Sequence, residues 1–287
     1  MTLTLGPRRF DTSDFAIMAI VNRTPDSFYA AGRSADLDAA LAAAGRALDA
    51  GADIVDVGGV RAGYGPAVDP ADELARVLPV VIGIRDRYPT LVISVDTWRH
   101  DVAETVIAAG ADLINDTWAG ADPLLVDVVA AAGAGVVCSH TGGLPPRTDP
   151  HRVAYADVVA DVVTTVTAAA EDAERRGVRR EAILVDPTHD FGKNTRHSLE
   201  LTRRLDELVA TGWPVLVALS RKDFIGETLD LPAADRLSGT LAATAVSAWH
   251  GAQVFRTHDV RATREVLDMV ASIRGTRPPK VARRGLA

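Results

Sequence analysis

The stretch WPVLVALSRKDFIG, residues 213–226, decides the fold of this chain. Its apolar run from Pro214 to Leu219 contains β-branched residues and no alternation of polar and apolar positions, which is typical of a strand buried on both faces. Such strands belong to parallel sheets, where the chemistry takes place just beyond the carboxyl end of each strand. Ser220 and Lys222 occupy that position, so both are candidate site residues.

A repeated pattern surrounds this strand. A Gly-Ala pair, placed to close an alanine-rich helix, is followed by a short apolar segment that ends in polar residues. The pattern begins at Gly51, Gly110, Gly133 and Gly251, and the helix that Gly251 closes is predicted at 233–250. With further strands predicted at 15–21, 91–95, 183–185 and 214–219, the chain has eight strands, each followed by a helical segment.

Eight βα units predict an α/β fold, a single-domain (β/α)8 TIM barrel over residues 15–275. We expect a short hairpin at 1–14 and a tail at 276–287. A doubly wound open sheet is the alternative, because a sequence pattern does not show closure. The barrel is favoured because no glycine-rich dinucleotide fingerprint follows the first strand. Long loops are predicted at 22–34, 58–70 and 140–153, on the face where the strands end.

Composition limits the function. The 287 residues carry a formal net charge of −7, which does not suggest a nucleic-acid surface. No run reaches the ~18 apolar residues of a membrane span, so we expect neither a membrane nor a nucleic-acid partner. The single cysteine, Cys138, ends an apolar run and is interpreted as a buried structural thiol. Because one cysteine excludes a disulfide within the chain, we expect a cytoplasmic protein.

A barrel would gather the polar strand ends around one mouth. One polar residue per strand is ordinary, since Asp and Asn favour helix N-caps, and that interpretation covers Asp56 and Asp116. Two carboxylates, an amide and an ammonium in a confined mouth, however, need partners, which a flat, donor-rich ligand would supply. These four residues are Asp96, Asn115, Asp186 and Lys222.

A second group suggests an anion site. Arg256 and His258 lie two residues apart, so on a strand they would point to the same side. Beside the Asn22 amide they form a candidate site for phosphate or pyrophosphate with Mg²⁺, which prefers oxygen ligands. A surface arginine with a capping histidine is the alternative. The absence of a His/Cys cluster argues against zinc, and the absence of a GxSxG elbow around Ser220 argues against a serine hydrolase.

Eight motifs together cover nearly the whole chain. They are IMAIVNRTPDSF (17–28), GADIVDVGG (51–59), ISVDTWRHDVAE (93–104), GADLINDTW (110–118), LVDPTHDFGKN (184–194), VALSRKDFIGE (217–227), GTLAATA (239–245) and FRTHDV (255–260). In these motifs and in their order, the sequence resembles the dihydropteroate synthase family.

The resemblance implies a homodimeric barrel that joins p-aminobenzoate to 6-hydroxymethyl-7,8-dihydropterin diphosphate and releases pyrophosphate in folate synthesis. By resemblance, Asn22 would bind Mg²⁺ and pyrophosphate, and Arg256 and His258 would hold the phosphates; together with Lys222 these are the residues expected to act in catalysis. Ser220, Phe191 and the Lys222 stem would border the aminobenzoate. The pterin edge would contact Asp96, Asn115, Asp186 and Lys222.

The sequence departs from the family mainly in its loops. Residues 60–65 read VRAGYG where the family usually has ESTRPG, and Thr188-His189-Asp190 replaces a common Gly-x-Gly. Ser139 stands where a methionine usually packs on the pterin, and Ala218 replaces a glycine that permits close approach. Three hypotheses follow: a working synthase with variant loops, a paralogue that has lost or reduced the reaction and binds a pterin or related ligand, and a pterin-dependent methyltransferase domain. The SRK-x-FIG and R-x-HD motifs make the third the weakest.

Overall fold

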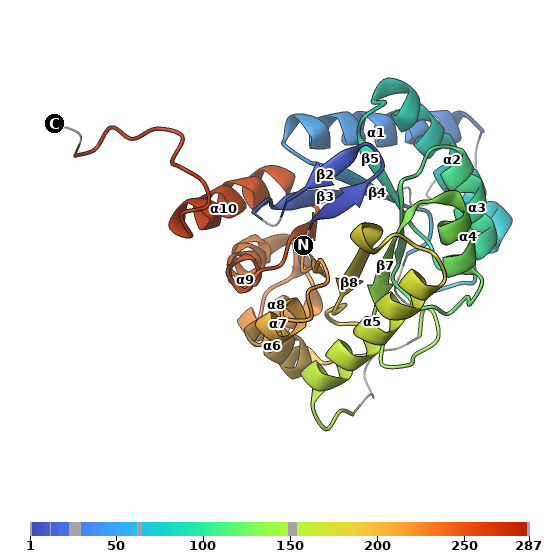
Figure 1. Ribbon diagram of the computed structural model, residues 1–287. Helices are drawn as coiled ribbons and strands as arrows, with labels where there is room; N and C mark the ends of the chain where they lie inside the picture. The colour runs from blue at the N-terminus through green and yellow to red at the C-terminus, as the bar shows by residue number, and fades with distance from the viewer. Residues whose placement is uncertain are drawn as a thin grey trace.

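Eight parallel strands form one sheet in the computed structural model, which describes residues 2–11, 13–22, 30–61, 63, 65–148 and 154–285, with the backbone alone at 22 and 30–36 (Figure 1). Along the sheet the order is β8-β7-β6-β5-β4-β3-β10-β9, and a bridge between Val185 and Val215 connects the two ends. The predicted (β/α)8 barrel is therefore confirmed. Its strands are β3 (Ala16–Asn22), β4 (Ile54–Gly58), β5 (Val92–Asp96), β6 (Leu113–Asp116), β7 (Gly135–Ser139), β8 (Ile183–Asp186), β9 (Leu216–Ala218) and β10 (Val254–Thr257).

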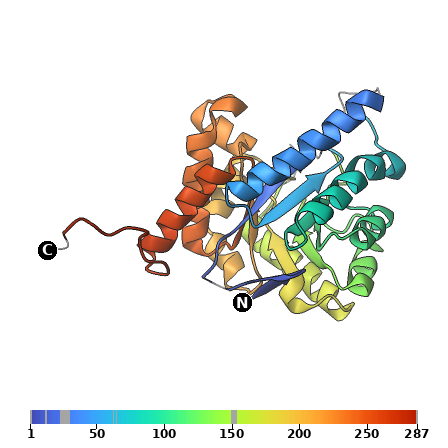
Figure 2. The same ribbon diagram turned by 90° about the horizontal axis from the view of Figure 1, so that it is seen from above.

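Helices surround the strands on the outside (Figure 2). The glycines of all four Gly-Ala pairs have positive φ, between 69° and 111°, which ends each preceding helix as predicted. The helices are α1 (Ala30–Asp49), α2 (Pro70–Arg87), α3 (His100–Ala108), α4 (Leu125–Ala132), α5 (Val158–Arg175), α6 (Thr195–Arg203), α7 (Leu205–Val209), α8 (Asp223–Leu229), α9 (Leu237–His250) and α10 (Val260–Ile273). After α10 the tail extends away from the barrel in both views (Figure 1).

The predicted N-terminal hairpin is present. Strand β1 (Leu3–Leu5) pairs antiparallel with β2 (Arg8–Phe10). Leu3, Leu5 and Phe10 pack in one buried cluster with residues from the barrel interior, such as Met18. The hairpin therefore covers the amino-terminal end of the barrel and leaves the carboxyl ends of the strands as the face that carries polar groups.

Two apolar layers place the polar groups. The inner layer contains at least one inward residue from each barrel strand, including Leu113, Val137, Leu184 and Ala218. The outer layer packs the strands against the helices and includes Cys138, whose burial raises its thiol pKa to about 12, so the thiol stays protonated. Because side chains alternate along a strand, positions two residues beyond the inner apolar residues also face the lumen. There they form a polar layer.

Two predicted boundaries differ in the structure. Helix α1 begins at Ala30, inside the loop predicted at 22–34, and residues 23–29 of that loop lie outside the described part of the chain. The single helix predicted at 233–250 is divided into a 3₁₀ turn at Ala233–Asp235 and α9. Arg236 separates the two, with φ −80° and ψ 4°, and its guanidinium donates to the carbonyls of Leu231 and Arg221.

Candidate functional site in the barrel mouth

Asp56 is the centre of the polar layer. It is fully buried on β4 and accepts hydrogen bonds from the Ser94 hydroxyl at 2.6 Å, the Asn115 amide at 3.2 Å and Arg256 Nε at 2.6 Å. The capping interpretation of Asp56 was therefore wrong, because the alternation along β4 turns its side chain into the lumen rather than toward a helix. Asp116 is not a helix N-cap either: its carboxylate accepts from the backbone N–H groups of Trp118 and Gly120 within a turn, and the next helix, α4, has Leu124 at its N-cap.

Arg256 connects Asp56 to Asp96. Its Nη2 donates to Asp96 Oδ2 at 3.1 Å, and the Thr117 hydroxyl donates to the other oxygen of Asp96. Burial opposes the charge of the guanidinium, but the carboxylates of Asp56 and Asp96 outweigh it and raise the pKa of Arg256. Burial also raises the pKa of Asp96 to about 7, against the pull of Arg256. The arginine predicted to hold phosphate thus has two carboxylate partners inside the lumen.

Asp186 lies across the lumen from this pair, at the end of β8. It is buried, and its Oδ1 accepts from the Thr188 backbone N–H at 2.7 Å. Burial raises the pKa of Asp186, while the charges of Lys222 and Lys193 oppose the rise. The structure therefore brings three of the four residues predicted for the mouth, Asp96, Asn115 and Asp186, to one polar layer.

Lys222 follows β9 and points to the segment after β8. Its ammonium donates to the His189 carbonyl and lies 5.0 Å from the centre of the Phe191 ring. That ring also meets Trp118 edge-on, with centroids 5.3 Å apart. Burial lowers the pKa of Lys222, although Asp190 and Asp186 draw it the other way. Lys222 and Phe191 therefore form one wall of the mouth.

The departure at residues 188–190 has a structural explanation. Thr188 and Asp190 keep the left-handed backbone that a Gly-x-Gly segment would adopt, with φ of 53° and 71°. The Asp190 carboxylate accepts from the backbone N–H of Asp223 at 2.7 Å and of Phe224 at 3.3 Å, so it caps the start of α8. The Asp190 side chain, which a glycine at this position would lack, thus connects the segment after β8 to helix α8.

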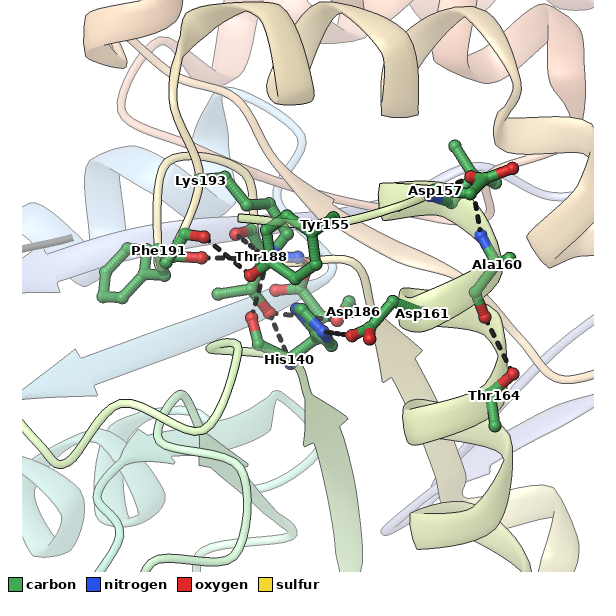
Figure 3. A network of polar contacts seen from close by, with 12 residues as sticks. His140, Tyr155, Asp157, Ala160, Asp161, Thr164, Asp186, Thr188, Phe191 and Lys193 are labelled. Carbon is green, nitrogen blue, oxygen red and sulfur yellow. Dashed lines mark hydrogen bonds and ion pairs between the residues drawn. The ribbon is translucent and has the colours of Figure 1, made fainter. Parts of the chain in front are cut away.

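Two buried groups beside the mouth, Lys193 and His140, were given no role from the sequence (Figure 3). Lys193 Nζ donates to the carbonyls of His140 at 2.9 Å, Phe191 at 2.9 Å and Thr188 at 3.2 Å. His140 Nε2 lies 2.7 Å from Asp161 of α5, and burial together with the charge of Lys193 lowers the pKa of His140 to about 4. Both residues lie in segments noted from the sequence, but no sequence pattern shows that three backbone carbonyls, one of them from the distant His140, would surround the Lys193 ammonium.

The remaining candidates lie at the rim. The backbone N–H of His258 donates to the Ser220 hydroxyl at 3.2 Å, which connects the ends of β9 and β10. The His258 residue is exposed; partial desolvation of its ring and the nearby charge of Arg256 lower its pKa. Strand β10 ends at Thr257, so the alternation of side chains along a strand does not extend to His258. The Asn22 side chain lies outside the described residues.

Comparison with known proteins identifies the class to which this mouth belongs. A family model described as "Pterin binding enzyme" matches residues 18–258, and the chain belongs to that family. Within it, a Mycobacterium leprae protein named "Inactive dihydropteroate synthase 2" is 60% identical over 275 residues, covering 94% of both chains. The dihydropteroate synthase of Escherichia coli is 37% identical over 261 residues, which cover 91% of this chain and 92% of that protein.

The solved structures agree. A Xanthomonas albilineans dihydropteroate synthase with 4-aminobenzoic acid superimposes with a TM-score of 0.86 at 36% identity, covering 95% of this chain and 98% of that one. The resemblance predicted from the motifs is therefore confirmed. The chain is a divergent paralogue in the dihydropteroate synthase family of transferases, similar to members that are named inactive.

Proposed function

We propose that this protein binds a pterin, or a ligand with the same polar edge, and has lost or strongly reduced the synthase reaction. The observation that carries the proposal is a contrast within the mouth. The groups predicted to bind a flat heterocycle are assembled, whereas the groups predicted to hold its diphosphate have little free charge. The name of the Mycobacterium leprae relative supports the same conclusion.

The part of the mouth that would bind the heterocycle has both hydrogen-bond acceptors and a donor. Asp96, Asn115 and Asp186 face one lumen, and Lys222 closes it from the end of β9. A carboxylate accepts from an amidine-like edge, and an ammonium donates to a carbonyl or ring nitrogen. Desolvated groups of this kind favour a ligand that replaces their water. These contacts support pterin binding by this chain.

The part of the mouth that would bind the diphosphate offers little positive charge. The Arg256 guanidinium is shared between two carboxylates, and the lowered pKa of His258 favours its neutral form at neutral pH. Departure of pyrophosphate needs positive charge where negative charge develops. In the loop after β4 the Ser-Thr-Arg set is missing; Arg61 is exposed there, and Ala62 and Tyr64 lie outside the described residues. We infer slow or absent turnover rather than absent binding.

Mg²⁺ would accompany a diphosphate rather than occupy a protein cage. The described residues contain no group of three or more His, Cys, Asp or Glu side chains that could hold a metal. Mg²⁺ often keeps several waters and few protein ligands, so the single amide of Asn22 suits a metal that arrives with its phosphates. Ser220 and Phe191 would border p-aminobenzoate if the protein binds it.

The proposal includes a cytoplasmic homodimer. Helices α6, α8, α9 and α10 pack side by side and carry exposed apolar side chains, which a second copy could cover. These residues are Leu199, Leu229, Val246, Trp249, Met269 and Ile273. Among the described residues, no helix is long and apolar enough to cross a membrane.

Two assays on one preparation test the function. Calorimetry measures binding of 6-hydroxymethylpterin, and a coupled assay measures pyrophosphate release from the pterin diphosphate with and without p-aminobenzoate. We expect measurable binding, lost in Lys222→Ala, and little release. Release at an ordinary enzyme rate with a coupled product would instead establish a working synthase with variant loops.

A further inference from the structure

Ser139 presents a hydroxyl to the lumen. It ends β7 and is paired in register with Asp186 of β8, just as Val137 is paired with Leu184. Val137 and Leu184 belong to the inner apolar layer. Because residues two apart on a strand share a face, Ser139 and Asp186 both point inward. The two side chains are therefore neighbours in the polar layer of the site.

The Ser139 hydroxyl is buried in the polar layer. The residue is 2% exposed, and its Oγ forms no hydrogen bond in the part of the chain that the structure describes. Buried polar atoms are nearly always hydrogen-bonded, so an exception that faces a binding site indicates a missing ligand atom. The other lumen oxygens at this level have partners, such as the bonds of Asp56 and Asp186 described above.

Strand β9 lies next to β8 on the side opposite β7, and it presents a methyl group to the lumen. Strand β9 follows β8 around the barrel through the bridge between Val185 and Val215. Its Ala218 belongs to the inner layer and is 9% exposed. A ligand edge held by Asp186 thus meets a methyl group on one side and an unpartnered hydroxyl on the other. Contact with the methyl group favours displacement of that edge toward β7.

We propose that Ser139 is a ligand-binding, specificity-determining residue that hydrogen-bonds the same heterocycle edge as Asp186; this rests on the proposed function. A carboxylate accepts only, whereas a hydroxyl both donates and accepts. The pair suits an edge in which N–H groups lie next to a carbonyl, as in a fused 2-amino-4-oxopyrimidine. Asp186 takes the N–H groups and Ser139 donates to the adjacent oxygen. Pterins and guanine share this edge and differ in the second ring.

The experiment compares Ser139→Ala with the matched control Ser247→Ala. Ser247 of α9 is also fully buried, and its hydroxyl also lacks a partner among the described residues, but it lies outside the lumen. Calorimetry with 6-hydroxymethylpterin and with guanine gives Kd for the wild type and both variants. Thermal unfolding of the three proteins reports any structural effect.

We expect Ser139→Ala to weaken binding of the preferred heterocycle about tenfold, with Ser247→Ala unchanged. Neither variant should unfold at a lower temperature, because each loses a hydroxyl without a partner. A Kd for Ser139→Ala within about twofold of the wild-type value would overturn the role of Ser139 and leave the proposed function standing. A wild type that binds neither compound would overturn both. The heterocycle that the wild type binds more tightly identifies the second ring, because Ser139 contacts the edge that both compounds share.

Discussion

Asp190 offers the most informative perturbation of the wall that holds Lys222. Its carboxylate accepts from the backbone N–H groups of Asp223 and Phe224 and from the Ser198 hydroxyl at 3.0 Å. Its backbone has φ 71°, a conformation that alanine adopts only with strain. Three substitutions separate the two contributions. Asp190→Ala removes the helix cap and adds backbone strain, whereas Asp190→Gly removes only the cap. Asp190→Asn retains a capping side chain and also accepts a positive φ.

The magnitudes follow from these differences. Loss of an N-cap costs about 1 kcal/mol, and a left-handed alanine costs about 1–2 kcal/mol more. We therefore expect Asp190→Ala to lower the free energy of unfolding by about 2–3 kcal/mol and Asp190→Gly by about 1 kcal/mol. Asp190→Asn should cost less than ~1 kcal/mol, because both residue types cap helices well.

Urea unfolding with a constant m-value measures the series. If Asp190→Ala and Asp190→Gly were equally stable, the strain argument would be refuted. If Asp190→Asn were as unstable as Asp190→Ala, the carboxylate would act through its charge and not as a cap. We expect Asp190→Ala to be the least stable variant and Asp190→Asn the most stable. That order would support the view that residues 188–190 keep the backbone of a Gly-x-Gly segment although they carry side chains.

Other predictions concern buried charge and pH. Asp56→Asn should destabilise by about 3 kcal/mol, because an amide cannot accept from all three donors and leaves Arg256 partly unpaired; a loss below ~1 kcal/mol would show that Asp56 is not the centre of the network. His140 has a folded pKa of about 4, below its ordinary 6.5, so the unfolded chain binds its proton first as the pH falls. Stability should therefore drop between pH 6.5 and pH 4 by up to about 3 kcal/mol, and His140→Gln should flatten this dependence in thermal melts. An equal slope in both proteins would contradict the lowered pKa.

The sequence predicted the barrel because its evidence is local. Apolar runs, Gly-Ala caps and polar strand ends each depend on a few adjacent residues, and the positive φ of Gly51 and Gly133 follows from them. The burial of Cys138 likewise followed from the apolar run that it ends. The motifs then indicated the polar lumen groups, since the position of a residue along a barrel strand determines whether its side chain faces inward.

What the sequence did not predict depends on contacts between distant strands. Asp56 was interpreted as a cap, although three donors from other strands surround it. Lys193 gave no signal because its acceptors are backbone carbonyls, which every residue carries. The unpartnered state of Ser139 is visible only when the whole lumen is assembled. The helix expected at 233–250 is interrupted because the Arg236 side chain bonds to the preceding segment.

The central claim is that ligand binding has been retained while the transfer reaction has not. Pyrophosphate release from the pterin diphosphate, followed with p-aminobenzoate at a pterin concentration that saturates the protein, tests it most directly. We predict calorimetric binding with release no faster than in a Lys222→Ala control. Sustained, aminobenzoate-dependent release accompanied by the coupled product would contradict the claim and establish a synthase.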